Sequence, residues 1–139
     1  MDPDEMGRAC LLDARRLEEF RVSHLAGAEP VEPLGRVPGE ALTDLVSRLR
    51  GRADPVVVYC SVGYRSARLA EALTRAGVPS VYSLRAGIFG WALDRRPLDG
   101  DANGRVHPFN ALFGLLLEPA LRARSSSPSG TEPSIRPEP

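Results

Sequence analysis

Residues 55–66 read PVVVYCSVGYRS, an apolar run followed by a short polar loop. The run from Pro55 to Tyr59 contains three β-branched valines and no charged side chain, which predicts a strand buried on both faces of a parallel sheet. Ser66 to Ala76 carries apolar residues on one helical face, with Gly77 as its stop and Pro79 just beyond. Cys60 therefore stands where a buried strand ends and a helix begins.

The position of Cys60 predicts a reactive thiol. A loop closed between a strand end and a helix start turns backbone N–H groups inward, and the helix adds its positive end, so the site favours an anion. Such a setting stabilises a thiolate over a thiol and makes the cysteine a nucleophile. The loop is expected to act mainly through its backbone, and these residues are the candidate substrate-binding set: Ser61, Val62, Gly63, Tyr64, Arg65 and Ser66. Gly63 is expected to take a left-handed turn, and Arg65 to hold an anionic substrate at the rim or to lie in solvent.

Apolar runs alternate with amphipathic runs on both sides of this loop. Strands are predicted at 9–13, 28–31, 55–59 and 80–84, and helical segments at 15–20, 39–50, 66–76 and 88–93. This order predicts an α/β fold, a parallel sheet with helices on both faces. Ligands of such folds bind at the carboxyl ends of the strands, where Cys60 lies and where Arg85 is a possible rim residue.

The composition narrows the classes of function. The 139 residues include 18 basic and 18 acidic side chains, with no long run of like charge, which predicts neither nucleic-acid nor membrane binding. Two cysteines fit a reducing compartment such as the cytoplasm, and their spacing is not that of a metal site. Cys10 is predicted to lie about 10 Å below the sheet edge, as a core thiol rather than a disulfide partner of Cys60.

Four segments in order resemble the single-domain rhodanese family of sulfurtransferases. They are Leu11 to Arg15 with Glu18-Glu19-Phe20, then Ser23 to Ala28, then Tyr59 to Ser66, and finally Leu84 to Gly87 with Trp91 and Pro97. The resemblance covers residues 9–98. It implies a rhodanese-like fold in which Cys60 carries a persulfide sulfur without a metal or cofactor. It also implies structural roles for Asp13, Arg15 and His24.

The sequence departs from the family pattern in two places. Family members carry an extra strand and helix before the strand that contains Asp13. Here only 12 residues precede Asp13, so the N-terminal elements are expected to be shortened. A missing edge strand exposes the ladder of the next strand. Ala86 stands where the family commonly has a glycine, which costs little unless that position needs a positive φ.

The expected domains are an acidic segment at 1–8, the rhodanese-like domain at 9–98, an extension at 99–124 and a disordered tail at 125–139. The extension contains an apolar stretch from Ala111 to Leu117, predicted to be a docking helix that covers the domain or associates with another copy. The tail is rich in serine and proline.

The leading functional prediction is a sulfurtransferase that moves sulfur from a small anionic donor such as thiosulfate through Cys60 to cyanide, a thiol or a thioredoxin-like protein. One alternative is a cysteine phosphatase or arsenate reductase. Four residues separate Cys60 from Arg65, whereas phosphatases of similar architecture have five. The other alternative is a non-catalytic interaction module or a shortened isoform.

Overall fold

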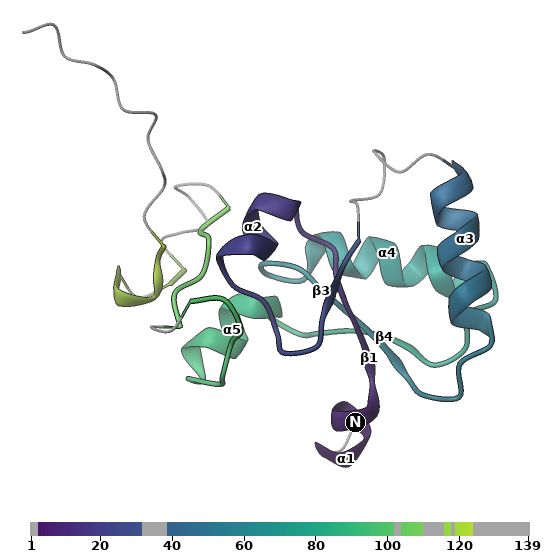
Figure 1. The fold of residues 1–139 in the computed structure, drawn as a ribbon, viewed down its shortest axis with the longest axis horizontal. Helices are drawn as coiled ribbons and strands as arrows, with labels where there is room; N and C mark the ends of the chain where they lie inside the picture. Colours follow the sequence, from purple (N-terminus) through teal and green to yellow (C-terminus); the bar gives the residue numbers. More distant parts are fainter. Residues whose placement is uncertain (1–2, 32–38, 102–103, 110–115, 118, 124–139) are drawn as a thin grey trace, which may run out of the picture.

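A computed structural model of the chain describes residues 3–31, 39–101, 104–109, 116–117 and 119–123. They form a four-stranded parallel sheet in the order β2-β1-β3-β4. The strands are β1 (Cys10–Asp13), β2 (Glu29–Pro30), β3 (Val56–Tyr59) and β4 (Val81–Ser83). The helices are α1 (Pro3–Arg8), α2 (Leu17–Val22), α3 (Gly39–Arg50), α4 (Tyr64–Arg75) and α5 (Gly87–Leu93), with a 3₁₀ turn η1 (Pro119–Leu121) near the end. The predicted α/β fold is confirmed (Figure 1).

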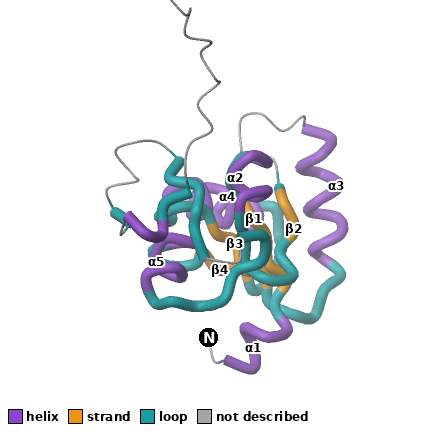
Figure 2. Tube along the Cα trace, turned by 60° about the vertical axis from the view of Figure 1, so that its left-hand side comes forward, coloured by secondary structure: helices purple, strands orange, loops and turns teal. Residues whose placement is uncertain are grey.

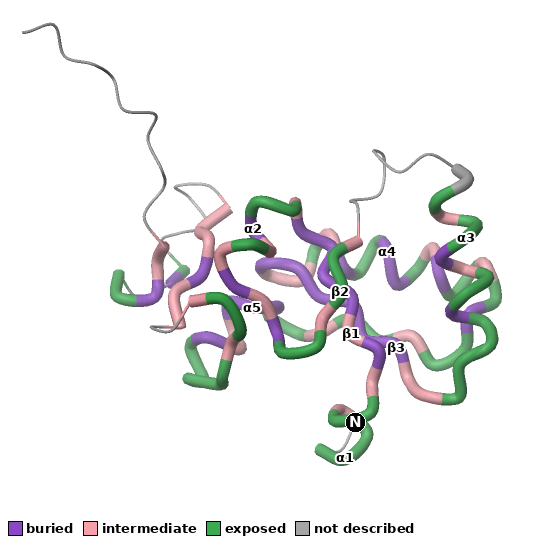
Figure 3. Tube along the Cα trace, viewed as in Figure 1, coloured by how far each residue is buried: buried purple, intermediate pink, exposed green. Residues whose placement is uncertain are grey.

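The sheet separates two hydrophobic cores. α3 lies on one side of it and α5 on the other (Figure 2). Along β3 the side chains alternate between the sides, because successive residues of a strand point to opposite faces. Val56 and Val58 join the α3 and α4 core, and Tyr59 joins the α5 core. All four β3 residues are buried, as the unbroken apolar run predicts (Figure 3).

The core on the α3 and α4 side is built from the apolar faces of these two helices. α4 buries Leu69, Ala70 and Leu73, which recur at helical spacing. Leu45 and Leu49 of α3 pack against the same cluster. The helix α4 ends as predicted, at a left-handed Gly77 with φ +87°. This packing fixes α4 against the sheet, so its first turn stays beside Cys60.

Residues beyond position 98 contribute to the core on the α5 side. Val106, Leu117 and Leu121 are buried there with Ile88 and Phe89 of α5. Backbone hydrogen bonds from Val106 N to Leu121 O (2.7 Å) and from Ala123 N to Val106 O (2.9 Å) join the two parts of this segment. The greater part of the predicted docking helix and the whole of the predicted tail lie outside the described residues.

A short helix precedes the first strand. α1 packs Met6 against the α5 core. Among the described residues, β4 pairs only with β3, so it is an edge of the sheet. The shortening of the N-terminal elements stays a prediction.

Candidate active site

Cys60 follows β3 directly and precedes α4 by three residues. Its side chain is buried, at 1 % exposure. In the register of the sheet Asp13 is paired with Tyr59, so the ends of β1 and β3 meet at one edge. The thiol thus lies at the carboxyl edge of the sheet, where parallel α/β folds place their ligands.

The loop after Cys60 turns back over the sulfur. Gly63 has φ +110°, a left-handed conformation that favours glycine, and its N–H donates to Cys60 Sγ at 3.1 Å. Gly63 is also the N-cap of α4, so the positive end of a 12-residue helix starts at the same place. One backbone donor and one helix end are therefore directed at the sulfur.

Two hydroxyl groups extend this environment. Ser66 Oγ lies 3.5 Å from Cys60 Sγ, 3.1 Å from the carbonyl oxygen of Gly63 and 2.9 Å from Ser83 Oγ. Ser66 is in the first turn of α4, and Ser83 is the last residue of β4. When Cys60 is a thiol, its S–H donates a hydrogen bond to Ser66 Oγ, and the Ser66 O–H donates to Gly63 O. Rotation of that hydroxyl lets it donate to a thiolate instead.

Backbone hydrogen bonds from the start of α5 also fix the loop that follows Cys60. Ile88 N donates to Cys60 O at 2.9 Å, and Phe89 N donates to Ser61 O at 3.1 Å. Gly87 has φ +55°, and a Cβ there would overlap the carbonyl oxygen of Cys60. Ala86 also has a positive φ, +58°, so this position does need the conformation that glycine takes most easily. The alanine therefore introduces backbone strain, which the sequence alone did not reveal.

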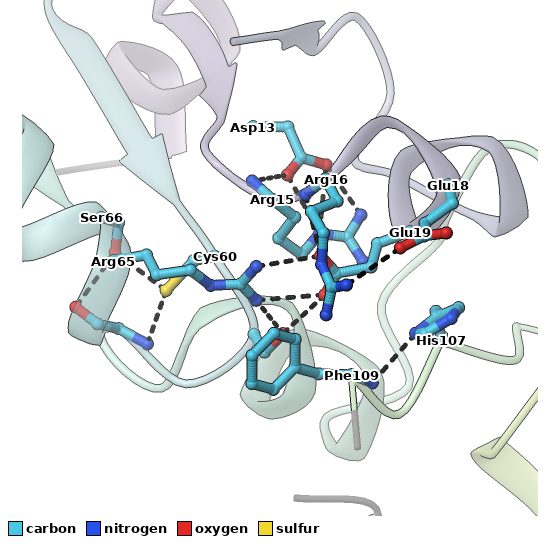
Figure 4. A network of polar contacts seen from close by, with 12 residues as sticks. Asp13, Arg15, Arg16, Glu18, Glu19, Cys60, Arg65, Ser66, His107 and Phe109 are labelled. Carbon is cyan, nitrogen blue, oxygen red and sulfur yellow. Dashed lines mark hydrogen bonds and ion pairs between the residues drawn. The ribbon is translucent and has the colours of Figure 1, made fainter. Parts of the chain in front are cut away.

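Arg65 makes its polar contacts within the fold. Its Nη1 lies 2.9 Å from Glu19 Oε2, and its Nη2 lies 3.1 Å from Glu19 Oε1 and 2.7 Å from Ser61 Oγ (Figure 4). Glu19 is fully buried on α2 and also accepts from Arg16 N at 2.8 Å. Burial alone would raise the pKa of Glu19, but the hydrogen bond and charge of Arg65 outweigh it and lower that pKa. The pair ties α2 to the active loop.

An aromatic ring covers the guanidinium of Arg65. The Arg65 Cζ lies 4.3 Å from the centre of the Phe109 ring, and the Arg16 Cζ lies 5.1 Å from it. Phe109 belongs to the segment beyond the predicted domain, and its N–H donates to His107 Nδ1 at 3.0 Å. Figure 4 shows the ring beside Arg65. Binding of an anionic substrate by Arg65 stays a prediction, and it would require part of this arrangement to change.

Asp13 and Arg15 form a fully buried ion pair at the end of β1, with Nη2 to Oδ2 at 2.7 Å. The same Nη2 donates to Ser23 O at 2.7 Å. Burial alone would lower the pKa of Arg15, and the hydrogen bond and charge of Asp13 more than compensate, so the pKa is raised. His24 stacks on Phe20 with ring centres 3.8 Å apart, and its Nδ1 is 2.9 Å from Phe20 O. These contacts connect β1 to the turn that follows α2.

The second cysteine lies at the other end of the sheet. Cys10 is paired with Val56, the first residue of β3, so the strand length separates it from Cys60. Both cysteines are free and buried. Burial raises the pKa of the Cys10 thiol, which disfavours its thiolate form.

The remaining predicted site residues lie around the loop. Val62 is half-buried and packs against the α5 core, Tyr64 is 69 % exposed, and Arg85 is exposed beside β4. Their roles in binding stay predictions. The structure adds Glu19, Ser83 and Phe109, which sequence reasoning did not place at the site. Ser83 could have been found from the sequence, since it lies in a predicted strand near the same sheet edge, and Glu19 lies in a segment that resembles the family.

A Rhodanese-like domain family model matches residues 2–94, about two thirds of the chain. The chain belongs to the rhodanese-like domain family. This rhodanese-like chain is 34% identical over 91 residues to the uncharacterized protein YibN of Escherichia coli, covering 65% of itself and 60% of YibN. It is 32% identical over 95 residues to thiosulfate sulfurtransferase 18 of Arabidopsis thaliana, covering 63% of itself and 70% of that protein.

One solved structure is similar to this rhodanese-like domain in both sequence and fold. It is a thiosulfate sulfurtransferase from Pseudomonas aeruginosa, 33% identical, with a TM-score of 0.56, and the match covers 69% of this chain and 18% of that one. Within the described part of the chain, His, Cys, Asp and Glu side chains form no group of three suited to a metal ion. No described helix has the length and apolar character needed to cross a bilayer.

Proposed function

We propose that this rhodanese-like protein is a sulfurtransferase that carries sulfane sulfur on Cys60. The observation that supports it most is the environment of the Cys60 sulfur: a backbone donor from Gly63 at 3.1 Å, the start of α4, and a nearby hydroxyl on Ser66. These groups favour a thiolate before the reaction and an anionic persulfide after it. Two of the similar proteins described above are named thiosulfate sulfurtransferases.

The reaction proceeds in two displacements that need no outside oxidant or reductant. The Cys60 thiolate attacks the outer sulfur of thiosulfate, a new S–S bond forms, and sulfite leaves with the electron pair of the old bond. An acceptor nucleophile such as cyanide then attacks the outer sulfur of the persulfide. Thiocyanate leaves, and the Cys60 thiolate is restored.

The residues around Cys60 have distinct parts in this proposal. The N–H of Gly63 and the start of α4 hold the charged sulfur in both states. The Ser66 hydroxyl donates to it when it is anionic, and Ser83 supports that hydroxyl. Arg65 is a positioning residue, because its guanidinium donates to Ser61 Oγ in the loop and to Glu19 on α2. In this proposal the loop also binds the small anionic donor, through backbone N–H groups such as that of Gly63.

The acceptor is proposed to be a low-molecular-weight thiol or a thioredoxin-like protein, with cyanide as a convenient substitute in assays. A persulfide is itself reduced by thiols, so turnover in a reducing compartment such as the cytoplasm needs no added reductant beyond the thiol pool. The presence of two free cysteines is compatible with such a compartment.

Mass spectrometry of the intact protein tests the proposal. Incubation with excess thiosulfate and no acceptor should add one sulfur atom, on the peptide that contains Cys60, and cyanide should remove it. Cys60→Ser should lose both the adduct and turnover, since a hydroxyl is not ionised at neutral pH and cannot carry sulfane sulfur. Cys10→Ser is the matched control and should keep both, with a modest loss of stability from a hydroxyl in the core.

Two results would contradict the proposal. Folded protein that takes up no sulfur but hydrolyses an aryl phosphate through Cys60 would be a phosphatase. Folded protein that does neither would be an interaction module.

A further inference from the structure

The outer edge of β4 presents backbone groups that have no strand beside them in the described part of the chain. Val56 N donates to Ser80 O at 2.9 Å, and Leu84 N donates to Val58 O at 2.8 Å. Alternate residues of a parallel strand turn toward the same neighbour, so Ser80, Tyr82 and Leu84 face β3. The N–H and C=O groups of Val81 and Ser83 therefore point outward. Such an edge is a template for pairing with another strand.

An apolar hollow of about 730 Å³ adjoins this edge on the α1 and α5 side of the sheet. Its apolar wall is formed by side chains that include Met6, Leu11, Val57, Leu84 and Trp91. Tyr82, in the middle of β4, lines it and is 51 % exposed. A strand that paired with β4 would thus also cover apolar surface, which adds to the hydrogen bonds of the edge.

The two ends of β4 differ in charge. A second hollow of about 340 Å³ at the start of the strand is lined by Glu5, Arg8 and Asp54, together with Ser80 and Tyr82. The larger hollow, at the end of the strand, is lined by Arg85 and Arg96. The charged side chains that line the smaller hollow sum to one negative charge, and those that line the larger hollow sum to two positive charges.

This charge pattern favours antiparallel pairing of the β4 edge with the β4 edge of a second copy. A two-fold axis through an antiparallel pair of identical strands brings the start of one strand beside the end of the other. The acidic end of one copy then meets the basic end of its partner at both ends of the pair, whereas parallel pairing of two copies would place like charges together.

We propose that two copies of this chain associate through antiparallel pairing of their β4 edges, with the axis at Tyr82. Val81 of each copy pairs with Ser83 of the partner subunit, and the two Tyr82 rings lie opposite each other beside the apolar hollows. Asp54 of each copy lies near Arg85 of the partner subunit. The eight-stranded sheet that results leaves the carboxyl edges with Cys60 open. This surface differs from the C-terminal apolar stretch from Ala111 to Leu117, where self-association was predicted from the sequence.

Sedimentation velocity of the full chain over a range of concentrations tests this interface. The wild type should form a dimer. Tyr82→Arg should be monomeric, because it sets two like charges opposite each other at the axis, where paired Cα atoms lie about 4.5 Å apart. Tyr82→Phe keeps the ring and should still dimerise. Circular dichroism of each variant establishes that it is folded.

A charge exchange tests the register without altering the strand. Asp54→Arg and Arg85→Asp should each weaken the dimer about tenfold, since each places like charges together at two symmetric positions. The double variant restores opposite charges and should recover the wild-type dissociation constant. A wild type that stays monomeric at all concentrations overturns the proposal. A dimer that persists in Tyr82→Arg, or charge variants that do not compensate, would show that another surface is used.

Discussion

The contact between Arg65 and Glu19 makes a prediction that separates two roles for Arg65. Replacing Arg65 by Met keeps most of the length of the side chain and removes its charge. The variant leaves the Glu19 carboxylate buried at 0 % exposure, with the N–H of Arg16 at 2.8 Å as a remaining donor. If Arg65 chiefly supports the fold, the variant loses stability. If it chiefly binds the donor, the variant loses affinity for thiosulfate.

The size of the stability loss follows from the burial of the pair. Removing one partner of a buried ion pair costs about 3–5 kcal/mol. The Arg65 side chain is 21 % exposed, and Glu19 keeps another donor, so water and Arg16 reduce the cost. We expect a loss of about 2–3 kcal/mol, which lowers the Tm of a chain of this size by roughly 10 °C.

Thermal and urea unfolding monitored by circular dichroism measure this loss. Arg68→Met is the matched control, because Arg68 is an exposed residue of the same helix, and it should change the free energy of unfolding by less than about 0.5 kcal/mol. Combining Arg65→Met with Glu19→Gln should cost less than the sum of the two single changes, since the buried carboxylate charge is then removed together with its main partner. An unchanged Tm together with a raised KM for thiosulfate would refute the structural role and assign Arg65 to donor binding.

Three further predictions concern the same loop and its supports. Ala86→Gly should raise the free energy of unfolding by about 0.5–1 kcal/mol, as measured by urea denaturation, because it relieves a non-glycine residue at φ +58°; a loss of stability would contradict the strain. Gly87→Ala should slow sulfur transfer and alkylation of Cys60 by about 100-fold, since its Cβ would displace the Cys60 carbonyl oxygen; wild-type rates would show that the loop tolerates the shift. The pKa of Glu19 is lower in the folded protein than its ordinary value of 4.5, so its pairing with Arg65 stabilises the fold fully above that pH and is lost as pH falls through the lowered value. Urea denaturation across this range should therefore show the deficit of Arg65→Met shrinking in acid, and a constant deficit would argue against the ion pair.

Local sequence patterns were sufficient to predict the bounds of most strands and helices. The apolar run at 55–59 and the helical stripe of α4 each predicted their element to within two residues. The helix at 39–50 was predicted with its observed bounds. These elements obey short-range rules, because side-chain periodicity and a glycine stop depend on neighbours in the chain. The segment from Ala28 to Val31 was predicted with the same rules and forms only a two-residue strand.

The sequence by itself determined that Cys60 follows a buried strand and precedes a helix, and that Gly63 makes the left-handed turn between them. Only the tertiary structure decided which groups meet around that cysteine. Arg65 pairs with Glu19, 46 positions away, and Ser66 meets Ser83, 17 positions away. Whether Arg65 points to solvent, to an anion or to Glu19 depends on how α2 packs against the loop. No sequence periodicity predicts the partner of Arg65. The partner is Glu19 because folding buries this carboxylate, and a buried carboxylate needs a hydrogen-bonded cation.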